Sequence, residues 1–180
     1  MSESSPAAEL YRRDLMERID TDQLLRRGPI LIEADCLDMM LHVAGSGIVE
    51  LVDGLYREPI SEGSAIDLVV LLTTYAVFGD VTGFGSEDAV VVLVSKPGGS
   101  GSFYDLAVVR KQDDTLTNIA RIQLGDRVQI KNLQIEDGEI VVEMLTQGPN
   151  DPMCCSTQNV SNRYAVENGE LVLIRSEVIE

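Results

Sequence analysis

The sequence is poor in basic residues. Lysine and arginine together number 14 against 30 aspartates and glutamates, which gives a formal net charge of −16. A field of that sign repels phosphate backbones and anionic lipid headgroups. The composition therefore argues against a nucleic-acid-binding protein, and it suits a solvated surface, a basic partner or a bound cation.

Aromatic residues are also scarce, since they make up 4% of the chain and tryptophan is absent. The core must be aliphatic, and the abundance of valine and isoleucine favours β-strands, where branched side chains pack well. The most apolar run, residues 68–78, is far shorter than the ~20 residues that a membrane-spanning helix needs, so no transmembrane segment is expected. A chain of 180 residues is long enough for one domain with a substantial core.

The N-terminal part predicts a helix over residues 6–27. Ser5 can cap this helix, Pro6 suits its first turn, and positions 8, 11, 15 and 19 place apolar side chains at helical spacing. Gly28 and Pro29 end it. We therefore divide the chain into an N-terminal helical segment, residues 1–28, and a single antiparallel β domain, residues 29–180.

Beyond Pro29 the pattern changes to period-two alternation and continuous apolar runs, which are typical of half-buried and fully buried strands. The short connections predict antiparallel pairing, because parallel neighbours need long crossovers. The expected fold class is mainly β, or α+β with the helix, built from hairpin-rich antiparallel sheets. The arrangement stays open between one curled sheet, two packed sheets and a partly closed one. Expected strands cover residues 30–34, 48–52, 55–58, 65–78, 88–95, 103–111, 115–124, 128–135, 140–144, 163–166 and 171–174.

Three dipeptides that tolerate positive φ predict two-residue hairpin turns: Asp-Gly at 53–54, Asp-Gly at 137–138 and Asn-Gly at 168–169. The first turn places Glu50 opposite Arg57, which would form a cross-strand charge pair. The other two turns align apolar residues across each hairpin, at 135/140, 133/142, 166/171 and 164/173.

An acidic, glycine-rich turn spans residues 79–88 between two apolar strands. It resembles calcium loops of the FG-GAP type, in which oxygen ligands alternate with glycines. Calcium takes six to eight oxygen ligands, and Asp80, Thr82 and Asp88 could supply three of them. Phe84 stands where such loops carry an acid, which favours the alternative of a metal-free turn.

Residues 148–157 contain two prolines followed by Met153, Cys154 and Cys155. Adjacent Cα atoms lie about 3.8 Å apart, closer than ordinary disulfides prefer, so a bond between these cysteines would be strained and readily reduced. The three sulfur atoms also suit Cu(I) or zinc. We favour a third alternative, packing in a rigid loop, because no other soft ligand converges on them.

The remaining candidates are expected to be structural. Cys36 and His42, the only histidine, are separated by a spacing without specificity, and acid–base catalysis needs a positioned partner. The glycines of residues 98–101 predict a hairpin turn, because a phosphate-binding loop also needs a lysine and a following helix. With no nucleophile elbow either, we assign no catalytic residue and expect a protein that is not an enzyme.

Four stretches together resemble an uncharacterised family of bacterial envelope proteins and lipoproteins that is frequent in cyanobacteria. They are residues 78–93, which begin FGD, GGSGSFY at 98–104, LGDRV at 124–128 and GPNDPMCCST at 148–157. The last is also distantly similar to the Cys-Cys segment of LppP/LprE-type lipoproteins, although Ser156 replaces the family's proline. The resemblance covers about residues 65–175 and implies a location in the cell envelope, but no activity.

The location stays open, because residues 1–27 carry charges throughout and lack the apolar stretch of an export signal. If Met1 is the true start, a cytoplasmic location is expected. The sequence as a whole predicts a non-enzymatic binding or interaction module for an unknown protein or small ligand, without a cofactor. The alternative is a soft-metal- or thiol-redox-active protein that uses the Met-Cys-Cys segment, and calcium is the other candidate ion.

Overall fold

The computed structural model describes residues 39–43, 47–112, 115–152 and 155–179. These ranges form eleven strands in two sheets, which confirms the predicted mainly β class with antiparallel pairing. Within them the structure contains no helix, and hence none that is long and apolar enough to cross a membrane. The helix predicted over residues 6–27, the strand predicted over 30–34 and Cys36 lie outside the described residues.

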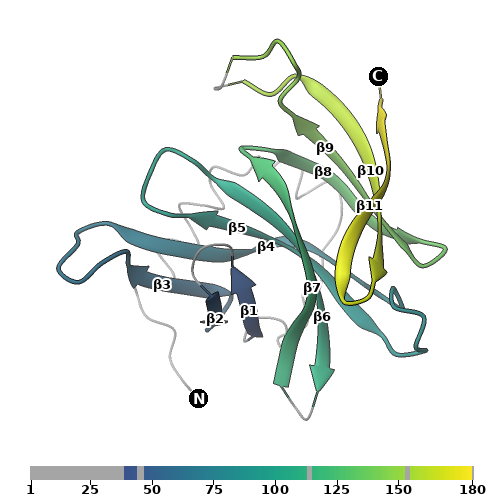
Figure 1. The fold of residues 1–180 in the computed structure, drawn as a ribbon, viewed down its shortest axis with the longest axis horizontal. Helices are drawn as coiled ribbons and strands as arrows, with labels where there is room; N and C mark the ends of the chain where they lie inside the picture. Colours follow the sequence, from purple (N-terminus) through teal and green to yellow (C-terminus); the bar gives the residue numbers. More distant parts are fainter. Residues whose placement is uncertain (1–38, 44–46, 113–114, 153–154, 180) are drawn as a thin grey trace.

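The larger sheet has seven strands. All neighbours are antiparallel except β1 and β7, which run parallel and share the pair Met40 and Thr117. This parallel contact joins the β1–β2 hairpin to the edge of a meander that starts at β3. In spatial order the strands are β2 (Gly47–Leu51), β1 (Met39–Val43), β7 (Thr115–Asp126), β6 (Phe103–Gln112), β5 (Asp88–Lys96), β4 (Asp67–Gly79) and β3 (Leu55–Pro59) (Figure 1).

This sheet curls because its first and last strands meet at one turn. Asp53 and Gly54 adopt φ of 53° and 72°, as the dipeptide predicts. Val52 and Leu55 exchange two backbone hydrogen bonds of 3.0 Å across the turn and form an isolated bridge. Beyond that bridge β2 pairs with β1 and β3 pairs with β4, so the two strands diverge.

The divergence overturns the predicted pairing of Glu50 with Arg57. Glu50 lies opposite Met40 of β1, whereas Arg57 forms an ion pair with Asp67 of β4. The turn itself was predictable, but the length of the ladder beyond it depends on which neighbours compete for each strand.

The smaller sheet is a meander of β8 (Gln129–Glu136), β9 (Glu139–Thr146), β10 (Gln158–Glu167) and β11 (Glu170–Val178), with β8 and β11 at its edges. Figure 1 shows this sheet, coloured green to yellow, lying across one side of the larger sheet. The predicted hairpin registers are confirmed at 135/140, 133/142, 166/171 and 164/173.

The two sheets bury a shared aliphatic core. Val90 and Val92 of β5 belong to one cluster with Ile140 and Val142 of β9, and all four are 0% exposed. The alternate residues of β5, from Ala89 to Leu93, belong to a second cluster inside the curl of the larger sheet. Strand β5 is therefore buried on both faces, as its continuous apolar sequence predicts.

The glycines of the two C-terminal hairpins give a direct test of these turns. Gly138 and Gly169 have φ of +81° and +82°. Replacing either with valine should lower the free energy of unfolding by about 1–3 kcal/mol, because a β-branched residue is strained at positive φ. Urea unfolding followed by circular dichroism measures the loss. Gly99→Ala is the matched control, since its new methyl group would meet no atom within 4 Å. Equal midpoints for all variants would contradict this turn geometry.

Candidate functional site

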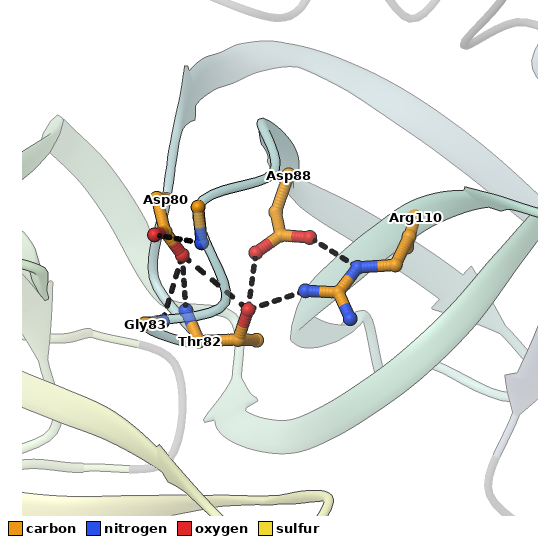
Figure 2. Close-up of polar contacts among 6 residues, drawn as sticks. Asp80, Thr82, Gly83, Asp88 and Arg110 are labelled. Atoms are coloured by element: carbon orange, nitrogen blue, oxygen red, sulfur yellow. Dashed lines mark hydrogen bonds and ion pairs between the residues drawn. The ribbon is translucent and has the colours of Figure 1, made fainter.

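The predicted calcium loop is a turn that Asp80 holds together. Its carboxylate accepts backbone hydrogen bonds from Gly83 at 2.7 Å, from Gly85 at 2.7 Å and from Thr82 at 3.2 Å (Figure 2). Gly83 and Gly85 both have φ of +76°, which lets their N–H groups point inward. These donors, Gly85 first, lower the pKa of Asp80. The stability that its ionised form contributes is present above the unfolded-state pKa and is lost as pH falls through the folded one.

Asp88, at the start of β5, is paired with an arginine of the adjacent strand. Its side chain is buried, and Arg110 Nε of β6 donates to Asp88 Oδ1 at 2.8 Å. The Thr82 hydroxyl lies 3.1 Å from Asp88 Oδ2, and it also accepts a hydrogen bond from Arg110 Nη2. The bond to Asp88 is the main cause of a raised Arg110 pKa. The guanidinium therefore supplies the positive charge beside these oxygens (Figure 2).

Phe84 completes this cluster. Its ring is 80% exposed, and the guanidinium carbon of Arg110 lies 5.6 Å from the ring centroid. That distance is within the range of a cation–π contact. The structure thus brings Asp80, Thr82 and Asp88 together as the sequence predicts, but it adds an arginine that we did not single out. The described residues contain no group of three or more acidic, histidine or cysteine side chains placed to hold a metal ion.

This geometry predicts the response to calcium. Millimolar Ca²⁺ should leave the melting temperature unchanged, because Asp80 already accepts three N–H groups and Asp88 is neutralised by Arg110. Differential scanning calorimetry with and without the ion measures the response, and Asp80→Ala is the matched variant. A clear upward shift in the wild type that Asp80→Ala abolishes would contradict this expectation.

The 148–157 loop, which joins β9 to β10, is closed by a second carboxylate. Asp151 Oδ2 accepts from the N–H groups of Gly148 and Thr157 at 2.7 and 2.8 Å, and the Thr157 hydroxyl donates to Oδ1 at 2.7 Å. These bonds, that of Gly148 first, lower the pKa of Asp151. A groove of about 550 Å³ lies between this loop and the end of β11, lined by residues 148–151, 157–159 and 178–179.

Of the three sulfur-bearing residues at positions 153–155, only Cys155 lies among the described residues. Cys155 is exposed, and its N–H donates to the Pro152 carbonyl at 3.0 Å. This exposure is compatible with the expected packing role, in which one cysteine of the pair faces inward and the other outward. Met153 and Cys154 lie outside the described residues. His42 lies in β1 opposite Ile48, apart from the 148–157 loop in the strand order.

The edge strand β11 carries a concentration of exposed apolar side chains. Val172, Leu173, Ile174 and Val178 are between 37% and 67% exposed. Among the described strands β11 pairs with β10 alone. The sequence does not reveal this edge, because an apolar strand gives no sign of whether both of its sides are paired.

The opposite edge of the same sheet is covered. The Tyr75 hydroxyl of β4 donates to the Ile130 carbonyl of β8. A methyl group built on Gly79 of β4 would lie only 3.1 Å from Ile135 Cδ1, so β4 and β8 approach closely. Edge strand β11 also approaches the larger sheet, at β7, but only Leu171 at its start is buried, and residues 172–178 are exposed. No family model matches the chain, and no curated protein or solved structure is significantly similar to it.

Proposed function

We propose that the protein is a non-enzymatic interaction module that binds an extended polypeptide segment by strand addition along β11. The observation that carries this proposal is a set of four exposed apolar side chains, three consecutive and one at Val178, on a strand that, among the described strands, is hydrogen-bonded on one side only. An edge of this kind offers main-chain donors and acceptors for affinity and alternating side chains for specificity.

The groove beside the 148–157 loop extends this surface. Val178 and Ile179 line it from the end of β11, and Asp151 fixes the loop that forms its other wall. A strand added to β11 would end beside this groove, where Asp151 already bonds Gly148 and Thr157 of the lining. A preformed surface favours binding because less conformational entropy is lost on association.

The polar clusters favour structural roles over catalysis. The carboxylates of Asp80 and Asp151 accept hydrogen bonds from backbone N–H groups of their own loops. Asp88 forms an ion pair with Arg110. A catalytic acid or base instead needs access to a substrate proton. We infer a location in the cell envelope from the resemblance of residues 65–175 to envelope proteins.

An octapeptide of alternating lysine and valine tests strand addition. Its positive charge suits a protein of net charge −16, and its alternation suits a pleated edge. In an NMR titration we expect amide shifts confined to β11 and to the groove residues 157–159. The control is the same peptide N-methylated at alternate residues, which keeps charge and side chains but cannot complete a ladder. Equal binding of both peptides, or no shifts in β11, would refute the proposal.

The exposed position of Cys155 favours one alternative, a thiol or soft-metal function of Met153, Cys154 and Cys155. Intact mass under non-reducing conditions tests for a vicinal disulfide, which would lower the mass by about two hydrogens. Elemental analysis of purified protein tests for copper or zinc. A stoichiometric metal or a protected disulfide would favour this function over strand addition, and Cys155→Ser would remove it.

A further inference from the structure

We infer that the strand added to β11 is β11 of a second copy of this chain, antiparallel to the first about a twofold axis at Ser176. This inference rests on the proposed function and names its partner. The two four-stranded sheets would then form one continuous sheet across the axis. Three features of β11 support this dimer: the direction of its amides, the pairing of its side chains, and the contact of its first residues with the larger sheet.

The amide directions follow from the ladder with β10. The Ile179 N–H donates to the Asn159 carbonyl at 3.0 Å, so it points toward β10. Successive amides of a strand alternate in direction, and the register runs unbroken from Val178 opposite Val160 to Arg175 opposite Arg163. The amides of Ser176 and Val178 therefore point away from β10, toward the open edge. A residue on the twofold axis must have this orientation to exchange hydrogen bonds with its own copy.

The side chains match in this register. With Ser176 on the axis, Arg175 lies opposite Glu177 of the second copy. Ile174, the extra residue of a bulge in the ladder with β10, ends the regular stretch next to Val178 of that copy. Arg175 and Glu177 already form an ion pair within one chain, and both are exposed, so they can exchange partners across the axis. Across the axis, Arg175 and Glu177 would form a non-hydrogen-bonded pair, the kind of pair in which facing side chains come closest.

The neighbouring registers are disfavoured. An axis at Arg175 would set two arginines opposite each other, and an axis at Glu177 would set two glutamates there. Like charges directly opposite are destabilising in an antiparallel pair. The axis at Ser176 lies between these two registers and places unlike charges, Arg175 and Glu177, opposite each other.

The start of β11 is excluded from the interface. A methyl group built on Gly169, in the turn before β11, would lie 3.9 Å from the Ile119 carbonyl of β7, so this end of the hairpin lies against the larger sheet. Leu171 is buried, whereas residues 172–178 are all exposed. The exposed stretch thus contains all the residues that the twofold register uses.

Net charge predicts how the association depends on salt. Each copy carries −16, so the copies repel each other at low ionic strength. Screening reduces this repulsion, and we expect the dimer fraction to rise between about 0.05 and 0.5 M NaCl. An interface held mainly by attraction between oppositely charged surfaces would weaken over the same range.

Sedimentation equilibrium of the full chain, at about 0.5 M NaCl, tests the interface. The wild type should dimerise reversibly. Arg175→Glu should weaken the dimer at least about tenfold, because it places like charges opposite each other twice. The exchange R175E/E177R should restore it. Ser176→Pro should abolish dimerisation while keeping the fold, because it removes an outward amide of an edge strand. Ile60→Ser, which removes an exposed apolar side chain elsewhere, is the matched control.

The outcomes separate this inference from the proposed function. A monomer at all concentrations, or a dimer that survives both Arg175→Glu and Ser176→Pro, would overturn the second copy as partner. If the chain is monomeric but the lysine–valine octapeptide still shifts β11, strand addition stands and its partner is a different chain. If the exchange R175E/E177R fails to restore a dimer that Arg175→Glu disrupts, the register about Ser176 is wrong and the inference fails.

Discussion

Replacing Arg110 with methionine should lower the free energy of unfolding by about 2–4 kcal/mol. The guanidinium is the cationic partner of Asp88, whose side chain is 0% exposed. Methionine keeps most of the aliphatic stem but leaves the carboxylate buried without its counter-charge. Removing one member of a buried pair costs more than the pair contributes, because the remaining charge stays desolvated. Urea unfolding of both proteins in the same buffer measures the difference.

Two controls isolate the buried charge. In D88N/R110M neither side chain is charged, so we expect much of the lost stability to return. Arg57→Met breaks a surface pair with Asp67, in which Arg57 is 52% exposed, and should cost less than about 1 kcal/mol. If Arg110→Met costs no more than Arg57→Met, the pairing of Asp88 with Arg110 is not a structural element of the fold.

The hairpins were predictable because their information is local. Asp-Gly and Asn-Gly dipeptides specify the turn, and the turn sets the register of the residues that flank it. The turn at residues 53–54 was predicted correctly, but the cross-strand pair of Glu50 and Arg57 does not form, because β2 and β3 separate after one bridge. The parallel contact of β1 with β7 joins residues that are distant in sequence, and no turn residue reports such a contact.

The candidate site likewise combines residues that are close in sequence, which could be predicted, with one that is distant in sequence, which was not. Asp80, Thr82 and Asp88 were found together because one turn contains them. Arg110 lies 22 positions beyond Asp88 and is reached only through the register of β5 with β6. Extending that register by one position beyond Ala89 and Val109 sets Asp88 opposite Arg110. A hairpin turn was predicted at the glycines of residues 98–101, and alignment of the two flanking strands across this turn would have identified the pair.

The exposed edge could not be predicted from the chain alone. The strand at 171–174 was expected as half of a hairpin, and its apolar residues suggested a buried face. In the structure Leu171 is buried, but Leu173 is 46% exposed although it lies opposite the buried Tyr164. Which end of a strand the other sheet covers depends on packing between the sheets, and periodicity carries no information on that.

A second buried aspartate, Asp105 of β6, should respond to pH in a way that Asp80 and Asp151 do not. Asp105 is 3% exposed, and Arg121 Nη1 of β7 donates to its Oδ1 at 3.1 Å. Burial raises the pKa of Asp105, and Arg121 opposes that rise. Because its folded-state pKa lies above the unfolded value, the ionised carboxylate costs stability above the folded pKa. That cost is relieved as pH falls and is absent below the unfolded value.

Arg121→Met removes the opposing charge, so the folded-state pKa of Asp105 should rise further and the cost at neutral pH should grow. We expect a loss of about 2–4 kcal/mol near neutral pH, shrinking steadily as the solution is acidified. Urea unfolding of wild type and variant, from about pH 8 down to about pH 4, measures this difference as a function of pH. In the background of Asp105→Asn the same arginine substitution should cost an amount that does not vary with pH. A loss that stays constant in the wild-type background as well would show that Arg121 acts by packing, and that Asp105 is not the group through which acid restores stability.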